Sequence, residues 1–342
     1  MAKTVSVVVP CFNESEVIAS THAELVRSLG GSPQFEFEFI FVDDGSSDAT
    51  PEILGDIQRN DSRVRLLRFS RNFGHQAAVS AGIDHAFGDA VAIMDADLQD
   101  PPHVVLAMLD KWQEGYEVVY GIRRNRKEGL FKRMCYRMFY KVWQKMANIN
   151  VQVDSGDFCV IDRKVADVLR SLPENARFLR GLRAWAGFRQ HGHPYERAAR
   201  QAGEPKYSFI RLVRLAASGI FNFSVVPLRV ISVIGLLTSL AATIGMVLLL
   251  LQRLFAIRLF GHAPQEMPGY TSVVLGLLFF SGIQLLSLGI IGEYIARMYG
   301  EIKRRPTYIV AERLGFPAQW QNQATDHGHA PKLVERSRAV SS

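Results

Sequence analysis

Two carboxylates stand directly after a short apolar run, Ala90–Met94, in the sequence Asp95-Ala96-Asp97-Leu98-Gln99-Asp100-Pro101-Pro102. The apolar run is typical of a strand buried inside a parallel sheet. In extended backbone the i, i+2 spacing directs Asp95 and Asp97 to the same side, and parallel sheets bind ligands at the carboxyl ends of their strands. Two hard oxygen ligands there suit Mg²⁺ or Mn²⁺ holding a diphosphate, which the metal would neutralise as a leaving group.

Asp-x-Asp is a short motif that also occurs in sites and turns of different kinds. An EF-hand loop opens in the same way, but it needs Gly at its sixth position and Glu at its twelfth. This chain has Asp100 and Leu106 there, which excludes an EF-hand. A solvated acidic turn is compatible with the pair by itself, so the choice depends on the rest of the chain.

Strand-like and helix-like stretches alternate in the first part of the chain. Strands are predicted at Val5–Val9, Phe37–Val42, Val64–Phe69, Ala90–Met94 and Glu117–Tyr120, with Pro10 ending the first. Helices are predicted over Glu14–Leu29, from Thr50 onward and over Gln76–Ala86. Such alternation indicates an α/β fold with a parallel, helix-covered sheet.

Polar side chains follow three of these strands. They are Asn13 and Glu14, then Asp43 and Asp44, then Asp95 and Asp97. The carboxyl ends of parallel strands meet at one edge of a sheet, so the three pairs should converge on one crevice. Three such loops are hard to explain as solvated turns. The GxGxxG and GxxxxGK[ST] patterns of other nucleotide-binding folds do not occur.

Composition divides the 342-residue chain into a soluble part up to about Pro205 and a mostly apolar part after Pro227. The net charge of +7 comes without a nucleic-acid-binding motif, so phosphate and anionic lipid are the expected partners and nucleic acid is not. Three scattered cysteines, Cys11, Cys135 and Cys159, are expected to be reduced thiols facing a cytosolic environment. The N-terminus carries no signal-peptide pattern.

Four motifs occur in order in the soluble part: VVVPCFNE at Val7–Glu14, VDDGSSD at Val42–Asp48, RNFG at Arg71–Gly74 and DADLQDPP at Asp95–Pro102. Together they resemble a family-2 glycosyltransferase of GT-A fold, in the dolichol-phosphate mannose synthase-like branch. The resemblance is closest to bacterial polyprenyl-phosphate (bactoprenol) glycosyltransferases with two C-terminal transmembrane helices. It implies a nucleotide-sugar donor, inversion at the anomeric carbon and a divalent metal, Mg²⁺ or Mn²⁺.

The resemblance also assigns roles to individual residues. Donor-binding roles fall on Pro10, Asn13, Glu14, Asp43, Asp44, Gly74, Asp95 and Ala96. Metal-binding roles fall on Asp95, Asp97 and Gln99, and catalytic roles on Asp97, Asp157 and Arg123. One departure is Asp100, which stands where many relatives carry His or Asn.

The region after Phe131 is expected to bind the acceptor. Phe131–Ala147 has the pattern of a basic, aromatic helix, for which an ordinary solvated surface helix is the alternative. Asp154–Phe158 resembles the Asp-x-Gly-Asp-Phe loop of the bacterial relatives, in which the second Asp, here Asp157, approaches the acceptor; a turn aspartate is the alternative. A phosphate acceptor is already an anion, which favours an orienting role for Asp157 over that of a strong base. The acceptor phosphate is assigned to Arg133, Arg197, Arg200 and Lys206.

Four segments are expected: a cytoplasmic GT-A catalytic domain over 1–205, an amphipathic interface region over 206–227, a transmembrane hairpin over 228–300, and a partly disordered cytoplasmic tail over 301–342. The spans are Val230–Leu251 and Tyr270–Gly292, uncharged runs of about 22 and about 23 residues, each long enough to cross the hydrocarbon. Lys and Arg crowd their outer flanks, which by the positive-inside rule places both termini and the active site in the cytoplasm. Small-xxx-small spacing favours close helix packing and a homo-oligomer.

The sequence therefore predicts an integral protein of the bacterial cell membrane that moves one sugar, with inversion, from a nucleotide-diphosphate sugar to undecaprenyl phosphate. A UDP-sugar such as UDP-glucose is favoured, and the product would be a lipid-linked sugar for cell-envelope glycans. Two alternatives stay open: a GDP-mannose-dependent polyprenyl-phosphate mannose synthase, and a non-catalytic, membrane-anchored nucleotide-sugar-binding protein. A processive polysaccharide synthase is not indicated, because its Gln-x-x-Arg-Trp motif does not occur.

Overall fold

The structure is a computed structural model, and it describes residues 2–124, 155–174, 177–196, 226–255 and 269–317. Contacts divide the chain into two compact units. One unit holds the long helices α9 and α10, and the other holds all the remaining described elements.

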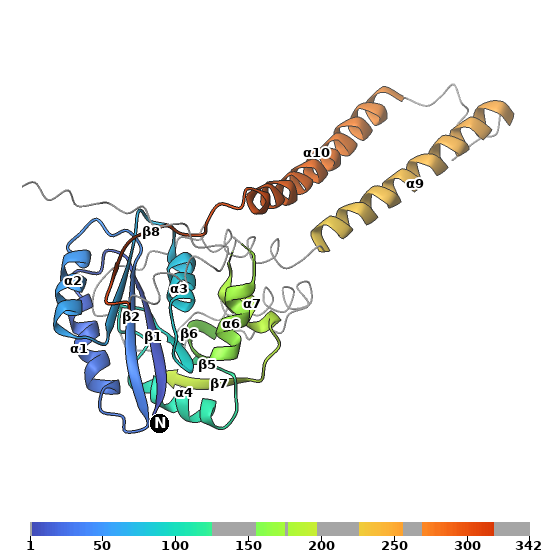
Figure 1. Cartoon of the computed structure of the whole chain (residues 1–342). Coiled ribbons are helices and arrows are strands. Elements are labelled where there is room, and N and C mark those ends of the chain that lie inside the picture. Colours follow the sequence, from blue (N-terminus) through green and yellow to red (C-terminus); the bar gives the residue numbers. More distant parts are fainter. Residues whose placement is uncertain (1, 125–154, 175–176, 197–225, 256–268, 318–342) are drawn as a thin grey trace, which may run out of the picture. The chain divides into compact units, whose positions relative to one another are not determined.

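In the described residues of the first unit, eight strands form one sheet in the order β7-β5-β6-β4-β1-β2-β3-β8 (Figure 1). Their bounds are β1 Lys3–Cys11, β2 Phe35–Asp43, β3 Val64–Phe69, β4 Ala90–Ile93, β5 Val118–Arg124, β6 Ser155–Asp162, β7 Gln190–Glu196 and β8 Val310–Leu314. The central strands β4, β1, β2 and β3 are parallel, as the alternation of strands and helices predicts. The sheet is nevertheless mixed, since β6 is antiparallel to both β4 and β5, and β8 is antiparallel to β3.

Helices cover both faces of this sheet. They are α1 Ile18–Leu29, α2 Thr50–Asn60, α3 His75–Asp84, α4 His103–Gln113, α6 Arg163–Ser171 and α7 Leu179–Trp185. Helices α1, α2 and α4 bury one face together with Val5, Val7 and Val9 of β1, while α3 packs on the opposite face against Val8. The alternation of side chains along β1 thus contributes to two apolar layers, as expected for a strand buried on both sides.

Strand β1 does not end at Pro10, as its sequence predicts, but continues to Cys11. The carbonyl of Val8 accepts from Met94 N–H on the β4 side, and the carbonyl of Cys11 accepts from Asp44 N–H on the β2 side. The N–H and C=O groups of successive residues point to alternate sides of a strand. Pro10 follows Val8 by two residues, so the N–H that proline lacks would have pointed towards β4. Because β4 has already ended at Ile93, no ladder hydrogen bond is lost there.

The second unit contains α9 Val226–Phe255 and α10 Gly269–Ile302. Within the described part of the chain, one stretch, Phe279–Ile302, is long and apolar enough to cross a membrane. It overlaps the second predicted span, Tyr270–Gly292, and extends ten residues beyond it. A hairpin of two spans therefore stays a prediction.

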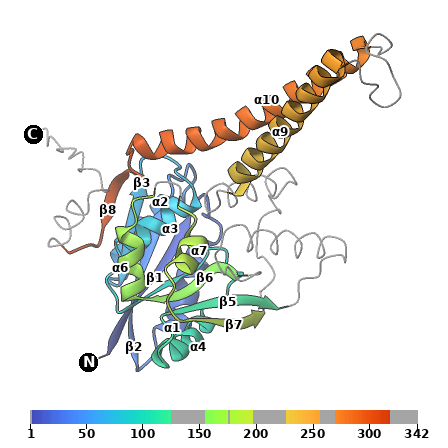
Figure 2. The ribbon, with the colours of Figure 1, turned by 90° about the vertical axis from the view of Figure 1, so that its right-hand side faces the viewer.

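The segment after α10, which the sequence predicts to be a tail, contributes β8 to the edge of the eight-stranded sheet beside β3 (Figure 2). Gly315 follows this strand with a φ of +78°, and an added Cβ there would lie 2.6 Å from the carbonyl oxygen of Val64. A side chain at this position would therefore be strained both by the backbone and by the close approach of β3.

Close packing of α3 on β1 can be tested at Gly82. An added Cβ there would overlap Val8 Cγ1 and lie 3.1 Å from Val8 Cβ. Gly82→Ala should lower the free energy of unfolding by about 1–3 kcal/mol, because it overfills a packed layer. Gly55→Ala in α2 is the matched control, since its nearest neighbour is Arg59 Nη1 at 3.7 Å and alanine favours a helix by up to about 1 kcal/mol. Equal denaturant unfolding curves for the two variants would contradict this packing.

Candidate active site

The loops after β1 and β2 are joined by hydrogen bonds. Asn13 N–H donates to Ser46 Oγ at 2.9 Å, and Asn13 Oδ1 accepts from Ser47 N–H at 2.9 Å. Glu14 N–H donates to Thr50 Oγ1 at 2.9 Å. Asn13 has a φ of +54°, a conformation that asparagine tolerates better than most residues. The polar residues predicted at the first two strand ends are therefore brought together, as expected.

Asp44 connects these loops to the one after β3. Its buried carboxylate accepts from Phe73 N–H at 2.7 Å and from Gly74 N–H at 2.9 Å. Burial raises the pKa of Asp44, although these two N–H groups act in the opposite direction. Gly45 has a φ of +70°, and a Cβ there would lie 2.8 Å from Arg71 Cα, so only glycine fits between the two loops. Both oxygens of the Asp44 carboxylate are therefore used in hydrogen bonds to the backbone of the loop after β3.

Asp43 differs from Asp44 in the hydrogen bonds that its carboxylate makes. Its Oδ1 accepts from Ser46 N–H at 3.0 Å, while Oδ2 lies 3.6 Å from Arg68 Nε and has no hydrogen-bond partner among the described residues. Burial raises the pKa of this fully buried carboxyl group. Oδ2 is closed off from solvent, so a ligand group reaches it only after a neighbouring side chain moves, whereas both oxygens of Asp44 already accept hydrogen bonds from the backbone. Of the two aspartates, Asp43 is the better candidate for contact with a nucleotide.

The backbone after β4 turns sharply within the Asp95–Asp100 segment. Leu98 has a φ of +53°, which is strained for a residue with a branched side chain. Gln99 N–H donates to Asp97 Oδ1 at 3.1 Å, and the carbonyl of Ala96 accepts from the buried Thr21 hydroxyl at 2.7 Å. Strain of this kind persists only where the surrounding contacts fix it, and it is common at functional sites.

Asp95 lies among other carboxylates. Burial raises its pKa, and the charges of Asp100, Asp157 and Asp97 add to this effect against the opposing influence of His75. A divalent cation would relieve the repulsion between these groups.

The described residues contain no group of three His, Cys, Asp or Glu side chains placed to hold a metal ion. Mg²⁺ commonly takes only one or two carboxylates from the protein and completes its shell with substrate phosphates and water. Asp95 and Asp97, with the side-chain amide of Gln99 beside them in sequence, fit a metal of this type, which would be held jointly with a diphosphate.

Asp157, at the start of β6, is surrounded by donors. Arg180 Nε and Nη2 donate to its two oxygens at 2.8 and 3.2 Å, and Gln76 Nε2 donates at 3.1 Å. His75 Nε2 lies 3.4 Å from Asp157 Oδ2 and 3.8 Å from Asp95 Oδ1, so one imidazole faces both carboxylates. Although burial works in the opposite direction, Arg180 and His75 hold the pKa of Asp157 well below its usual range. The carboxylate is ionised and already paired, which suits an orienting group better than a base.

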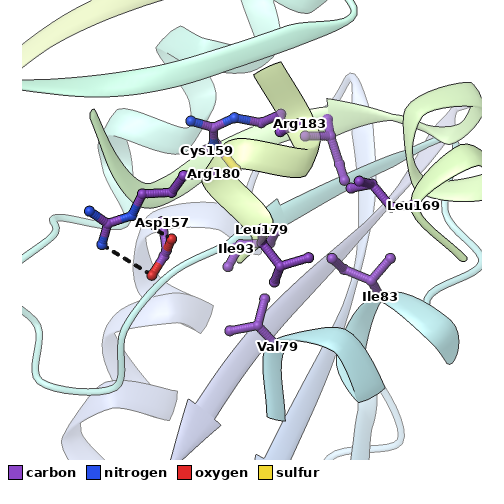
Figure 3. Close-up of a pocket in the computed structure, with 10 residues that line it drawn as sticks. Val79, Ile83, Ile93, Asp157, Cys159, Leu169, Leu179, Arg180 and Arg183 are labelled. Atoms are coloured by element: carbon purple, nitrogen blue, oxygen red, sulfur yellow. Dashed lines mark hydrogen bonds and ion pairs between the residues drawn. The ribbon is translucent and has the colours of Figure 1, made fainter. Parts of the chain in front are cut away.

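A small pocket backs this pair (Figure 3). Its walls are the apolar side chains of Val79, Ile83, Ile93, Ile161, Leu169 and Leu179, together with Asp157, Cys159, Arg180 and Arg183. It has room for about one water molecule, so it supports the Asp157–Arg180 pair and does not itself admit a substrate.

Arg123 is oriented by a second polar cluster. Its Nε donates to the Tyr195 hydroxyl at 3.3 Å, and its Nη2 lies 3.9 Å from Asp100 Oδ2. The Tyr195 hydroxyl in turn donates to the buried Asp100. A Cβ added at Gly156 would lie 3.3 Å from Arg123 Nη2, so this glycine lets the guanidinium approach the residue next to Asp157. Asp100 thus anchors both Arg123 and Tyr195.

Three residues that contact Asp157 were not predicted to be in the site: His75, Gln76 and Arg180. His75 directly follows the Arg71–Gly74 motif, which is a signal that could have revealed it. Arg180 lies in a short helix without any local motif. The acceptor residues Arg133, Arg197, Arg200 and Lys206 lie outside the described residues, and their assignment stays a prediction.

Comparison with known proteins identifies the family. Residues 6–170 match the model described as Glycosyl transferase family 2. The chain is 44% identical to the "Uncharacterized glycosyltransferase YkcC" of Bacillus subtilis (strain 168), over 91% of this chain and 94% of that protein. It is 38% identical to the "Prophage bactoprenol glucosyl transferase homolog" of Escherichia coli (strain K12), over 90% of this chain and 98% of that protein. Among solved structures, glucosyl-3-phosphoglycerate synthase from Mycobacterium tuberculosis in complex with UDP is similar with a TM-score of 0.44 and 20% identity, over 65% of this chain and 79% of that one. The chain belongs to glycosyl transferase family 2.

Proposed function

We propose that this protein transfers one sugar from a nucleotide-diphosphate sugar to a polyprenyl phosphate, with inversion at the anomeric carbon. UDP-glucose is the favoured donor and undecaprenyl phosphate the favoured acceptor. The observation that carries the proposal is the similarity to the bactoprenol glucosyl transferase homolog over 90% of this chain and 98% of that protein. A similarity of this extent continues well beyond the family-2 match at residues 6–170.

The donor would bind at the carboxyl ends of β1, β2 and β4. Asp43 would contact the nucleoside once a neighbouring side chain exposes its carboxylate, and Pro10 and Glu14 would line the same pocket. Asp95, Asp97 and Gln99 would hold the divalent metal together with the diphosphate. When bound, the metal neutralises the charge that develops on the leaving nucleoside diphosphate.

The acceptor phosphate would attack the anomeric carbon from the face opposite the diphosphate. One carbon–oxygen bond forms to the lipid phosphate and one breaks to the donor phosphate, so the step requires no proton transfer. This agrees with an Asp157 that is ionised and paired with Arg180 and therefore not free to act as a base. Asp157 orients its neighbours, and Arg123 supplies positive charge beside it, so that positioning and electrostatic stabilisation provide the acceleration.

The first prediction tests the reaction itself. Purified protein is incubated with undecaprenyl phosphate and a panel of UDP- and GDP-sugars, and the lipid product is read by mass. Product from UDP-glucose and its loss in EDTA are expected; product only from GDP-mannose would select the mannose synthase alternative. Asp97→Asn should lower turnover at least about a hundredfold, the scale of removing one strong electrostatic stabiliser. Asp110→Asn, an exposed carboxylate on α4, is the matched control. If no sugar is transferred but a nucleotide sugar still binds, the protein is the non-catalytic binding protein.

The second prediction separates donor from acceptor residues. Arg200→Ala or Lys206→Ala should weaken use of the polyprenyl phosphate about tenfold or more, because each removes one charge-assisted hydrogen bond, and should leave donor affinity near normal. Asp157→Asn should lower turnover by less than Asp97→Asn. Arg59→Ala, an exposed arginine on α2, serves as the control. The affinity for the donor is measured by calorimetry, and the dependence of the rate on acceptor concentration by kinetics. If donor affinity collapses and the acceptor dependence is unchanged, these residues belong to the nucleotide site.

The third prediction concerns the membrane. We propose that α9 and α10 form a two-span hairpin with the catalytic part and both ends of the chain in the cytoplasm, and that the protein is a homo-oligomer. The apolar stretch Phe279–Ile302 and the basic residues outside the predicted spans support this topology. A cysteine introduced between Gly261 and Gly269 should react with a membrane-impermeant reagent added from outside intact cells. Labelling only after the cytoplasm is opened would contradict the orientation.

A further inference from the structure

Tyr308 lies six residues after the end of α10 and is buried in the catalytic unit, with 5% of its surface exposed. Its ring stacks on Phe69 with a centroid separation of 5.1 Å and an interplanar angle of 11°. Its hydroxyl donates to Asp84 Oδ2 at 2.9 Å. Burial and the Asp84 charge hold the pKa of Tyr308 well above its usual value, so the hydroxyl keeps the proton that it donates.

These two contacts reach opposite ends of α3. Asp84 is the last residue of α3, and Arg177 Nη1 lies 3.8 Å from its Oδ1. Phe69 packs edge-on against Phe73 at 5.7 Å, and Phe73 N–H is held by Asp44 immediately before α3 begins. One side chain from the segment after α10 therefore supports both the loop that leads into α3 and the residue that ends it.

The first turn of α3 contacts the active site. Its residues His75 and Gln76 both face Asp157, and Gln76 Oε1 also accepts from Leu179 N–H at 3.0 Å. A helix of ten residues behaves as a short rigid rod, so a change at its supports alters where His75 and Gln76 lie. Catalysis by positioning is sensitive to shifts of this kind, even when their cause is remote from the reacting atoms.

We propose that Tyr308 is a positioning residue for the transfer reaction: through Phe69 and Asp84 it fixes α3, and α3 fixes the donors around Asp157. The inference rests on the proposed function for the identity of the reaction. The segment that follows α10 in the chain is then part of the catalytic apparatus and does more than close the edge of the sheet.

The test replaces Tyr308 by Phe, which keeps the ring on Phe69 and removes only the hydrogen bond to Asp84. We expect kcat to fall on the order of fivefold, the effect of one lost hydrogen bond, while the donor Kd measured by calorimetry stays within about twofold. Hydrogen exchange should rise at the amides of residues 73–84 and stay unchanged at the amides of β1. Tyr116→Phe is the matched control: it removes the hydroxyl of a tyrosine whose ring packs against His191 at the far end of the sheet, and it should change neither kcat nor exchange in α3.

A purely structural role gives a different pattern. Tyr308→Phe would then lower the melting temperature and raise exchange throughout the sheet, and kcat measured well below the melting temperature would equal that of the parent; this result would overturn the proposal. Tyr308→Ala, which also removes the stacking on Phe69, should lower kcat further than Tyr308→Phe. If the parent protein transfers no sugar, the proposed function fails, whereas the exchange at residues 73–84 still decides whether Tyr308 holds α3.

Discussion

The Asp44 carboxylate accepts hydrogen bonds from Phe73 and Gly74 N–H and thereby fixes the point at which α3 begins. Gly74, with a φ of +101°, occupies a backbone conformation that few other residues would tolerate there. This anchor ties the loop after β3 to the loop after β2, directly before the helix whose first residue, His75, lies 3.8 Å from Asp95 and 3.4 Å from Asp157. The Asp44 carboxylate thus holds the backbone of the site in place, while the residues around it are the candidates for contact with the substrates.

The pKa values of two half-buried carboxylates in the same site are shifted in opposite directions. Burial and the charges of Asp100, Asp157 and Asp97 raise the pKa of Asp95 against the opposing influence of His75, whereas Arg180 and His75 lower the pKa of Asp157 despite burial. The carboxylates around Asp95 favour the binding of a cation together with the substrate, whereas Arg180 and His75 already provide positive charge beside Asp157. In the proposed reaction, this difference would distinguish the side of the leaving group from the side of the acceptor. It also agrees with the proposal that the site needs no general base, since the proposed nucleophile is already an anion.

The sequence predicts the parallel centre of the sheet because its strands are apolar, short and bounded by turn residues. It does not predict that β6 inserts antiparallel between β4 and β5, since the choice of neighbour depends on tertiary packing and on no local pattern. Strand β8, with the sequence VAERL, is short and half polar, as edge strands often are, and is hard to distinguish from a tail. In the site, Asp43 and Asp44 are adjacent and chemically identical, and only their hydrogen bonds distinguish the one that holds backbone. Arg180 follows Asp157 by 23 residues and belongs to no motif, so only the folded chain reveals it.

The position of β8 also constrains how the protein is made. Its pairing with β3 joins Leu66 to Leu314, so the catalytic sheet is completed by residues that the ribosome adds only after α9 and α10. Until then the edge of β3 presents unpaired backbone groups, which other strands can join. Contacts this distant in sequence form slowly, because a long loop must close before any pairing energy is gained. The catalytic unit therefore finishes folding only after α9 and α10 have been synthesised. A nascent chain that stalls before Val310 carries an open, aggregation-prone edge.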